Sequence, residues 1–457
     1  MIQKNKTRST VAAAVLASAV CAPFAHAQSN DALLDKLVEK GTITAKEANE
    51  LRQESDAGFV KSLQVRNGMP DWVTTMKLYG DFRGRFDQVA TDNSVPGGPN
   101  VDRNRYRYRL RTGVTATLKD SFEVGFRLTS ADPDGSFGGD PISGNTTMQN
   151  GASKKFVFID LAYGKWTPIK TGPWLLSATF GKIENPIVGS DIVFDSDYTP
   201  EGLAIQAGYD LNTEHALKFN GGFFALDEFN QGASGQRPFN DPYFLAGQVR
   251  LESKWSPKIQ TSLGVTWISI YGSTALLTAN VPNRNVGNTR NVAGGLVNNY
   301  TPIIGDAFMT YTLDSFPLYP GTFPIKFGGD YMVNTSAATM NTGYTLGVTF
   351  GKAAKKGTWE LGYKYKYLEA DANYEEFLDS DTGAYSQAAS AITGASAGYN
   401  AGTGVRGHNF RIAYAPSDSF TVSATYYLFD LINPSIVAGL PTESRAGRLQ
   451  VDAMWKF

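Results

Sequence analysis

The sequence predicts an all-β protein, a transmembrane up-and-down antiparallel β-barrel of about sixteen strands that is preceded by a short helical hairpin. Three observations lead to this prediction. Apolar and polar residues alternate with a period of two from residue 74 to the last residue, which is the pattern of strands with two different faces. The connections between these segments alternate between long and short. The chain also opens with a secretory signal.

The first segment of the chain has the parts of a secretory signal peptide. Three basic residues precede an apolar run over 11–25, and small residues at Ala25 and Ala27 suit cleavage by signal peptidase. We therefore expect residues 1–27 to be removed and the mature chain to begin at Gln28.

The composition excludes several kinds of site. The single cysteine, Cys21, lies in the signal, so the mature chain offers no disulfide, thiol nucleophile or zinc–thiolate site. Of the 42 Lys and Arg residues, three lie in the signal, which leaves 39 against 43 Asp and Glu, a net charge of about −4. Without a basic excess, no nucleic acid partner is expected. No later stretch approaches the roughly 18 consecutive apolar residues that a spanning helix needs.

Residues 28–73 contain the one convincing helical segment. An apolar face built on Leu33, Leu37 and Val38 ends at Gly41, and the capping box 44–47 opens a second short helix. We expect a helical hairpin that serves packing or oligomerisation. Binding to the cell wall or to a partner is the alternative.

The alternation begins clearly at 78–86, where apolar or small residues hold the even positions and polar residues hold the odd ones. A charge that faces lipid near mid-membrane costs about 2–4 kcal/mol for Arg or Lys, so the charged face of each strand must line the lumen. On the last strand Arg448 and Asp452 lie on that face, opposite Leu449 and Trp455. The expected strands are 74–87, 103–118, 121–130, 155–167, 174–183, 202–210, 214–226, 243–255, 258–272, 304–314, 322–333, 343–353, 357–370, 404–415, 418–430 and 445–457.

The connections support a barrel more strongly than the strands do. Short turns such as 119–120 and 416–417 separate long connections, so that loops gather at one end and turns at the other. A soluble sandwich would not be expected to show this regular asymmetry. The long connections are 88–102, 131–154, 184–201, 227–242, 273–303, 334–342, 371–403 and 431–444.

Several of these segments together resemble the putative porin family of Gram-negative outer membranes. They are the signal, the hairpin from Leu33 to Arg52, the strands 78–83 and 103–109, the stretch 181–203 and the terminal Phe457. The resemblance implies a barrel in the cell outer membrane, passive transport of solutes, and helices in the periplasm. It also implies a homotrimer and recognition of Phe457 by the barrel-assembly machinery.

Arginine is concentrated on the expected lumenal face of the first two strands. Like charges on paired strands destabilise the pair unless counter-charges or water balance them. If the hairpin closes symmetrically around 88–102, Arg85 lies opposite Arg105 and Asp81 opposite Arg109. The basic residues expected to line the pore are Arg83, Arg85, Arg103, Arg105, Arg107, Arg109 and Arg111.

The third long connection carries the expected counter-charges. In porins the third external loop folds inward and narrows the channel, and the resemblance implies the same fold here. A basic wall that faces an acidic loop creates a transverse field, which orients polar solutes and disfavours apolar ones. The acidic residues of the expected constriction loop are Glu184, Asp191, Asp195, Asp197 and Glu201.

Other functions receive little support. Only His215 and His408 remain in the mature chain, so a multi-histidine metal site is excluded and a Ser-His-Asp hydrolase would depend on one of them. Asp132, Asp134 and Asp140 could hold calcium in an external loop, although Asp-Pro and Asp-Gly are foremost turn sequences. We expect no enzymatic activity, no cofactor and no structural metal.

The sequence thus predicts a signal peptide over 1–27, a periplasmic hairpin and linker over 28–73, and an outer-membrane barrel over 74–457. The predicted function is a porin for small hydrophilic solutes or ions, surrounded by outer-membrane lipid. An anion- or carboxylate-selective channel is one alternative. A structural or adhesive barrel, tethered by its N-terminal helices, is the other.

Overall fold

The computed structural model describes residues 69–93, 102–131, 142–228, 241–277, 281, 287–291, 293–382, 384–385, 399–400, 402–432 and 444–457. The chain divides into two compact units, Met1–Thr74 and Thr75–Phe457. The expected signal peptide, Cys21 and the helical segment of 28–68 lie outside the described residues, as does the acidic loop from Asp132 to Asp140. No helix in the described part of the chain is long and apolar enough to cross a membrane.

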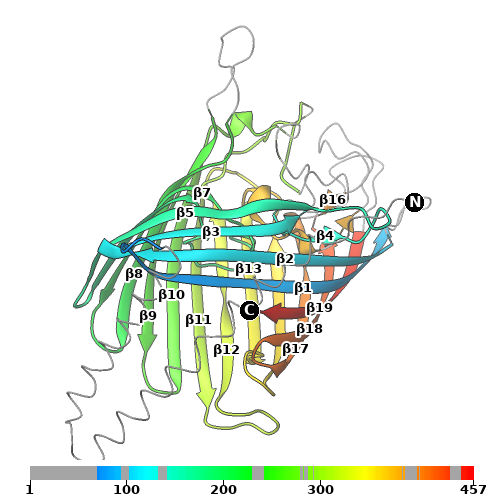
Figure 1. Cartoon of the computed structure of the whole chain (residues 1–457). Coiled ribbons are helices and arrows are strands. Elements are labelled where there is room, and N and C mark those ends of the chain that lie inside the picture. Colours follow the sequence, from blue (N-terminus) through cyan, green and yellow to red (C-terminus); the bar gives the residue numbers. More distant parts are fainter. Residues whose placement is uncertain are drawn as a thin grey trace, which may run out of the picture. The chain divides into compact units, whose positions relative to one another are not determined.

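Sixteen long strands form one closed antiparallel barrel, as the alternation predicts (Figure 1). They are β1 (Val73–Asn93), β2 (Arg103–Leu118), β3 (Phe122–Ala131), β5 (Phe156–Thr171), β6 (Trp174–Lys182), β7 (Glu201–Asp210), β8 (His215–Ala225), β9 (Tyr243–Lys254), β10 (Ile259–Tyr271), β11 (Pro302–Leu313), β12 (Phe323–Asn334), β13 (Thr342–Gly351), β14 (Trp359–Leu368), β17 (Val405–Ser417), β18 (Phe420–Leu431) and β19 (Ser444–Lys456). Two-residue strands also form at β4 (Thr146–Thr147), β15 (Ala384–Tyr385) and β16 (Tyr399–Asn400).

The barrel closes where the first and last strands meet. β1 pairs antiparallel with β19, from Asp81 opposite Lys456 to Asn93 opposite Ser444, so the blue and red strands lie side by side in Figure 1. Closure pairs the backbone groups that a sheet would otherwise leave free at its two edges. β4 adds a short pairing to β2, with Arg107 opposite Thr147.

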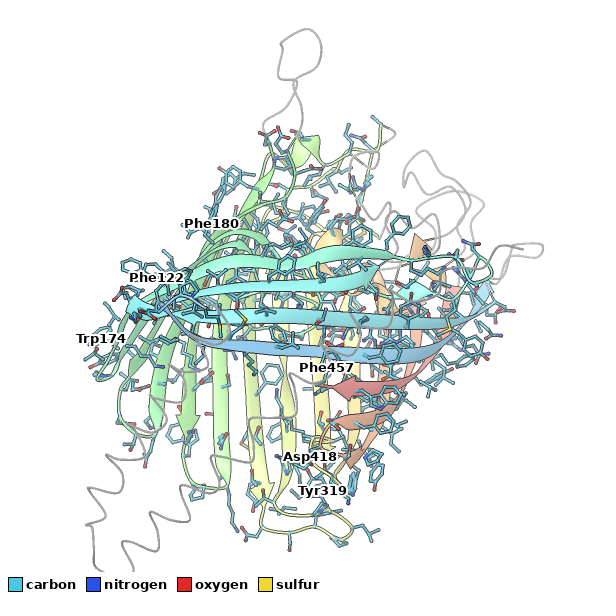
Figure 2. The ribbon with its side chains drawn as sticks, viewed as in Figure 1. Phe122, Trp174, Phe180, Tyr319, Asp418 and Phe457 are labelled. Atoms are coloured by element: carbon cyan, nitrogen blue, oxygen red, sulfur yellow. The ribbon has the colours of Figure 1, made fainter. Side chains whose placement is uncertain are left out.

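The barrel wall is apolar on its outer face and polar on its inner face, which is the reverse of the distribution in a soluble protein. Large apolar side chains are exposed on the outside, among them Phe122 and Trp174, which lie at strand ends in Figure 2. The inside holds buried charges such as Arg85, Arg250 and Asp306. An apolar exterior around a polar interior is the arrangement that a hydrocarbon surrounding requires. The charged face therefore lines the lumen, as predicted.

The described parts of three connections fold into the barrel and pack on one another. We call them the β6–β7 loop (183–200), the β10–β11 loop (272–301) and the β14–β17 loop (369–404). Phe194 of the first packs on Phe377 of the third, with ring centroids 4.9 Å apart, and Phe377 also packs on Phe244 of β9 at 4.8 Å. The resulting apolar cluster lies against the inner wall formed by β7 to β14. Buried charged residues lie on β19, β1 and β2, and also on β9 at Arg250 and on β11 at Asp306.

Candidate functional site

The arginines of β1 and β2 lie on the inner face of the barrel, as the period of two requires. Arg85, Arg107 and Arg109 are buried, Arg83 and Arg105 are half-buried, and so is Arg111. Arg103 differs because it is exposed at the start of β2. Six of the seven predicted residues therefore line the inside of one hairpin.

Carboxylates on the same strands balance part of this charge. Asp87 accepts hydrogen bonds from Arg105 and from Arg448 of β19, the latter at 2.7 and 3.1 Å. Asp81 binds Arg109 at 3.2 Å and Arg111 at 2.7 Å. Ion pairs within the wall thus relieve the repulsion between neighbouring arginines that the sequence anticipates.

Arg85 belongs to the same network through a bidentate pair with Asp452. Its Nε and Nη2 donate to the two carboxylate oxygens at 2.7 and 2.9 Å, across the β1–β19 junction where the two residues are register partners. Such fork-to-fork geometry is the strongest form of an arginine–carboxylate pair. The pair ties the charged wall to the closure of the barrel.

Asp197 is the acidic residue of the β6–β7 loop that reaches the arginine wall. Arg109 Nη1 donates to its two oxygens at 2.9 and 2.7 Å, and Arg111 Nη1 lies 3.3 Å from Oδ1. Asp195, two positions before Asp197 in the chain, accepts a hydrogen bond from the Asp197 backbone N–H at 2.7 Å. Asp195 therefore shapes the turn that presents Asp197.

The other three predicted loop carboxylates pair elsewhere. Asp191 lies 2.5 Å from Lys364 Nζ and 3.7 Å from Lys366 Nζ, both on β14. Glu184 pairs with Arg127 at 2.9 Å and Glu201 with Lys182 at 3.1 Å, and both glutamates are mostly exposed. Glu184, Asp191 and Glu201 thus form three pairs that are separate from the contact of Asp197 with the arginines of β2.

Sequence reasoning missed a second acidic segment, in the β14–β17 loop. Asp381 lies 3.0 Å from Arg448 and 3.6 Å from Arg85, and it faces the same wall as Asp197. Asp379 accepts a hydrogen bond from the Asp381 backbone N–H at 2.7 Å, which repeats the geometry of Asp195 and Asp197. The sequence does contain a pattern that could have identified this segment. An Asp-Ser-Asp triplet follows an apolar residue at 379–381, just as it does at 195–197.

The two Asp-Ser-Asp turns and the arginine wall enclose a cavity of about 230 Å³. Arg83, Arg85 and Arg411 supply its basic lining, and Ser423, Thr425 and Gln450 supply neutral polar groups. Its acidic lining consists of Asp195, Asp197, Asp379, Asp381 and Asp452. We call this cavity, with its walls, the constriction cluster.

The two loop aspartates of the second triplet differ in their protonation. Burial raises the pKa of Asp379 to about 7, and the neighbouring carboxylates of Asp381 and Asp191 act in the same direction. Burial would also raise the pKa of Asp381, but Arg448 and Arg85 hold it below its usual range. Asp381 is therefore a permanent anion at neutral pH, whereas Asp379 exchanges its proton there.

Arginines outnumber carboxylates in the direct contacts of the wall, although the cavity itself is lined by three arginines and five aspartates. Seven arginines of the wall take part in its contacts, whereas five carboxylates do. The arginines are Arg83, Arg85, Arg105, Arg107, Arg109, Arg111 and Arg448, and the carboxylates are Asp81, Asp87, Asp197, Asp381 and Asp452. Arg83 donates to a neutral group, Asn145 Oδ1, at 2.8 Å, and Arg107 lies 3.9 Å from its carboxylate. Among these contacts, Arg83 and Arg107 have the weakest pairing with a carboxylate.

The two histidines considered for metal binding or hydrolysis contact residues outside the constriction cluster. His215 packs on Trp255, with ring centroids 4.9 Å apart, and His408 Nδ1 lies 3.0 Å from Tyr363 Oη. Within the described ranges, no group of three or more His, Cys, Asp and Glu side chains could hold a metal ion.

Comparison with known proteins supports a channel. Residues 97–274 match a family described as "Putative porin". The prediction of a putative porin family is thereby confirmed over this stretch, which holds Arg103 to Arg111 and the whole β6–β7 loop. No curated protein matches the chain.

Solved structures of porins and channels also resemble the chain. OprB of Pseudomonas putida matches with a TM-score of 0.47 and 9% identity, over 88% of this chain and 97% of that one. The outer membrane channel DcaP of Acinetobacter baumannii gives 0.41 and 12%, over 84% and 97%. A triple mutant of the Rhodopseudomonas blastica porin gives 0.38 and 10%, over 84% and 100%.

Proposed function

We propose that this chain is an outer-membrane porin, a water-filled channel through which small hydrophilic solutes diffuse passively. The observation that carries the proposal is the constriction cluster. Two inward-folded loops bring Asp197 and Asp381 against an arginine wall, inside a barrel whose outer surface is apolar. This arrangement provides a polar path through a membrane and a narrow point along it.

The constriction cluster can select by charge and polarity. Arginines on the wall and carboxylates on the loops face each other across a small cavity, which produces a field transverse to the direction of passage. A dipolar solute exchanges its water for oriented charges, whereas an apolar solute loses water without compensation. Small polar solutes should therefore pass more readily than apolar ones of equal size.

The anion- or carboxylate-selective channel is the second candidate, and the excess of arginines in the direct contacts of the wall favours it. In these contacts Arg83 donates to a neutral group, Asn145, and Arg107 lies 3.9 Å from its carboxylate. A solute carboxylate or phosphate can supply the missing charge. This alternative requires no further site.

Planar-bilayer recording of the mature protein tests both candidates. A porin gives stable stepwise conductance, and the reversal potential in a salt gradient gives the sign of its preferred ion. Replacing Arg105, Arg107 and Arg109 by Gln should shift the preference toward cations while the barrel stays folded. The exposed Arg103 changed to Gln is the matched control. Absence of steps would refute the porin, and unchanged selectivity in the triple variant would remove these arginines from the path.

Further features of the proposal concern the setting of the barrel. We propose removal of 1–27 on export, a periplasmic position for the helices of 28–73, recognition of Phe457 by the assembly machinery, and a homotrimer. The alternative from a different functional class is a structural or adhesive barrel tethered by those helices. It predicts a folded barrel with no stepwise conductance.

A further inference from the structure

The barrel wall is incomplete beside the β6–β7 loop. β5 begins at Phe156, but its pairing with β6 begins at Ala162, opposite Lys182, where β6 ends. Within the described strands, residues 156–161 are paired with β3 on one side only. At about 3.3 Å per residue, this leaves about 20 Å of free strand edge. The gap exists because the chain after Lys182 turns into the lumen instead of continuing the wall.

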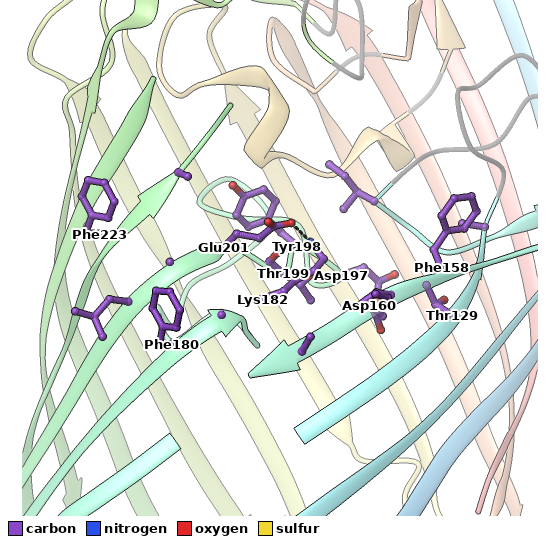
Figure 3. Close-up of a pocket in the computed structure, with 18 residues that line it drawn as sticks. Thr129, Phe158, Asp160, Phe180, Lys182, Asp197, Tyr198, Thr199, Glu201 and Phe223 are labelled. Carbon is purple, nitrogen blue, oxygen red and sulfur yellow. Dashed lines mark hydrogen bonds and ion pairs between the residues drawn. The ribbon is translucent and has the colours of Figure 1, made fainter. Parts of the chain in front are cut away.

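A cavity of about 870 Å³ occupies this gap, which we call the lateral notch (Figure 3). Ile159 of β5, Phe180 of β6, and Leu203 of β7 line its outer part, together with Phe223 of β8. These side chains are between 42% and 70% exposed on the membrane-facing surface. The outer part of the lateral notch is thus apolar, and its size falls within the range of ligand pockets.

The inner part of the lateral notch is polar and reaches the constriction cluster. Asp197, whose oxygens bind Arg109 and Arg111, lines both cavities. Thr199, Lys182 and Glu201 lie beside it, and Figure 3 shows Asp197, Tyr198, Thr199 and Lys182 close together. A second cavity of about 450 Å³ shares Tyr198 and Thr199 and continues to buried residues of the inward loops. The lateral notch therefore runs from the outer surface to the interior.

A free strand edge and an apolar surface need different partners. Unpaired backbone groups cannot face hydrocarbon, so the N–H groups of the edge at 156–161 require hydrogen-bond acceptors. The apolar side chains at Phe180 and Leu203 require an apolar contact. A membrane amphipath provides both, through the oxygen atoms of its head group and through its alkyl chain.

We propose that the lateral notch is a binding site for a membrane amphipath. Its alkyl chain lies along Ile159, Phe180 and Leu203, and its head-group oxygens meet the free edge of β5 and the polar floor at Thr199 and Lys182. The surrounding membrane supplies such a molecule at high local concentration. Occupancy of the site can be measured by mass without any conductance, so failure of this proposal is distinguishable from failure of the porin proposal.

Native mass spectrometry of the folded mature barrel tests the proposal, with palmitoyl-oleoyl-phosphatidylcholine as the probe. Ala162 lines the lateral notch and is exposed, so Ala162→Trp should fill it without burying a polar group. We expect the wild-type barrel to retain a single saturable phospholipid and Ala162→Trp to retain roughly tenfold less, as for the loss of about two buried methylene contacts. Phe180→Ala removes apolar contact without adding bulk, and it should weaken retention in the same direction.

Ala178→Trp is the matched control. Ala178 lies on the same outward face of β6, opposite Trp166 in the β5–β6 register, and outside the lateral notch. It should retain the phospholipid as the wild type does, and gel mobility with and without heating should show that all variants are folded. Equal retention in Ala162→Trp, or no saturable retention in the wild type, would overturn the proposal. The proposal would also be overturned if the wild type formed an oligomer that binds no phospholipid and that dissociates in Ala162→Trp. A second copy of the chain would then cover the lateral notch.

Discussion

Arg109 Nη1 donates to both carboxylate oxygens of Asp197, at 2.9 and 2.7 Å, although 88 positions separate the two residues in the chain. The contact fastens the β6–β7 loop to the strand wall. Arg111 joins it from the same strand, and Asp81 holds both arginines from β1. The position of the loop in the lumen therefore depends on charge as well as on its apolar residues.

Replacing Asp197 by Asn should change both conductance and selectivity. The variant loses a charge-assisted contact worth about 1.5–3 kcal/mol and leaves two arginines facing the cavity with less compensation. We expect larger single-channel conductance and a shift of the reversal potential toward anions. The control is Glu201→Gln, because Glu201 is 65% exposed and forms its ion pair with Lys182, away from the arginine wall. Identical recordings for the Asp197→Asn and wild-type channels would contradict a constriction at this residue.

The channel should respond to pH through Asp379. Its pKa is raised to about 7 by burial, with Asp381 and Asp191 contributing, so it is largely neutral at pH 5 and charged at pH 9. Raising the pH adds a negative charge to the constriction cluster and should move selectivity toward cations. Asp379→Asn should flatten this dependence of the reversal potential between pH 5 and 9. A variant that keeps the full dependence would assign it to another group.

The same shift has a consequence for stability. Because the folded state holds the Asp379 proton more tightly than the unfolded chain, this group stabilises the fold below its ordinary pKa and the contribution is lost as pH rises toward 7. Asp379→Asn should therefore unfold at a guanidinium midpoint that depends less on pH over this range. If the wild-type midpoint rose with pH over this range relative to that of Asp379→Asn, the sign of this contribution would be wrong.

The Arg290–Glu375 pair should be essential for the packing of two inward loops. Both side chains are fully buried, with Arg290 Nη2 2.5 Å from Glu375 Oε1, and Arg290 Nη1 also donates to Leu276 O and Gly294 O. Arg290→Met leaves a buried charge without compensation, at a cost of about 3–5 kcal/mol. Hydrogen exchange should accelerate at 287–291 and 371–378.

A double variant and an exposed pair provide the controls for this experiment. Arg290→Met combined with Glu375→Leu removes both charges, so it should restore much of the protection. Lys258→Met breaks the exposed Lys258–Asp314 pair and should leave exchange in the loops unchanged. Normal exchange in Arg290→Met alone would show that the apolar cluster suffices.

Removal of the Phe457 side chain should impair assembly more than stability. Its backbone N–H and C=O pair with Gly80 at 3.1 and 2.9 Å at the closure of the barrel, and its side chain is 61% exposed near β1 (Figure 2). If this residue is the assembly signal, Phe457→Ala lowers the heat-modifiable band in outer membranes. Refolding of the urea-denatured variant in detergent should stay near the wild-type yield. Poor refolding in detergent would assign the effect to barrel closure instead.

Local patterns were sufficient to predict the strands and their two faces. Strands such as 103–118 begin and end where the alternation does, because a period of two records directly which side chains meet lipid and which meet water. β1 extends to Asn93, beyond the predicted 87, since its last residues pair with β19. That pairing links the two ends of the barrel sequence, and no local pattern encodes it.

The sequence by itself determined the barrel and the inward arginines, since each follows from residue type at a fixed spacing, and its composition showed that the third long connection is acidic. Only the tertiary structure decided which carboxylates meet the arginines. Asp197 and Asp381 do, whereas Asp191 pairs with Lys364 on β14. The physical reason is that loops have no fixed period. Their side chains are placed by packing inside the barrel, and contacts between residues far apart in the chain determine that packing.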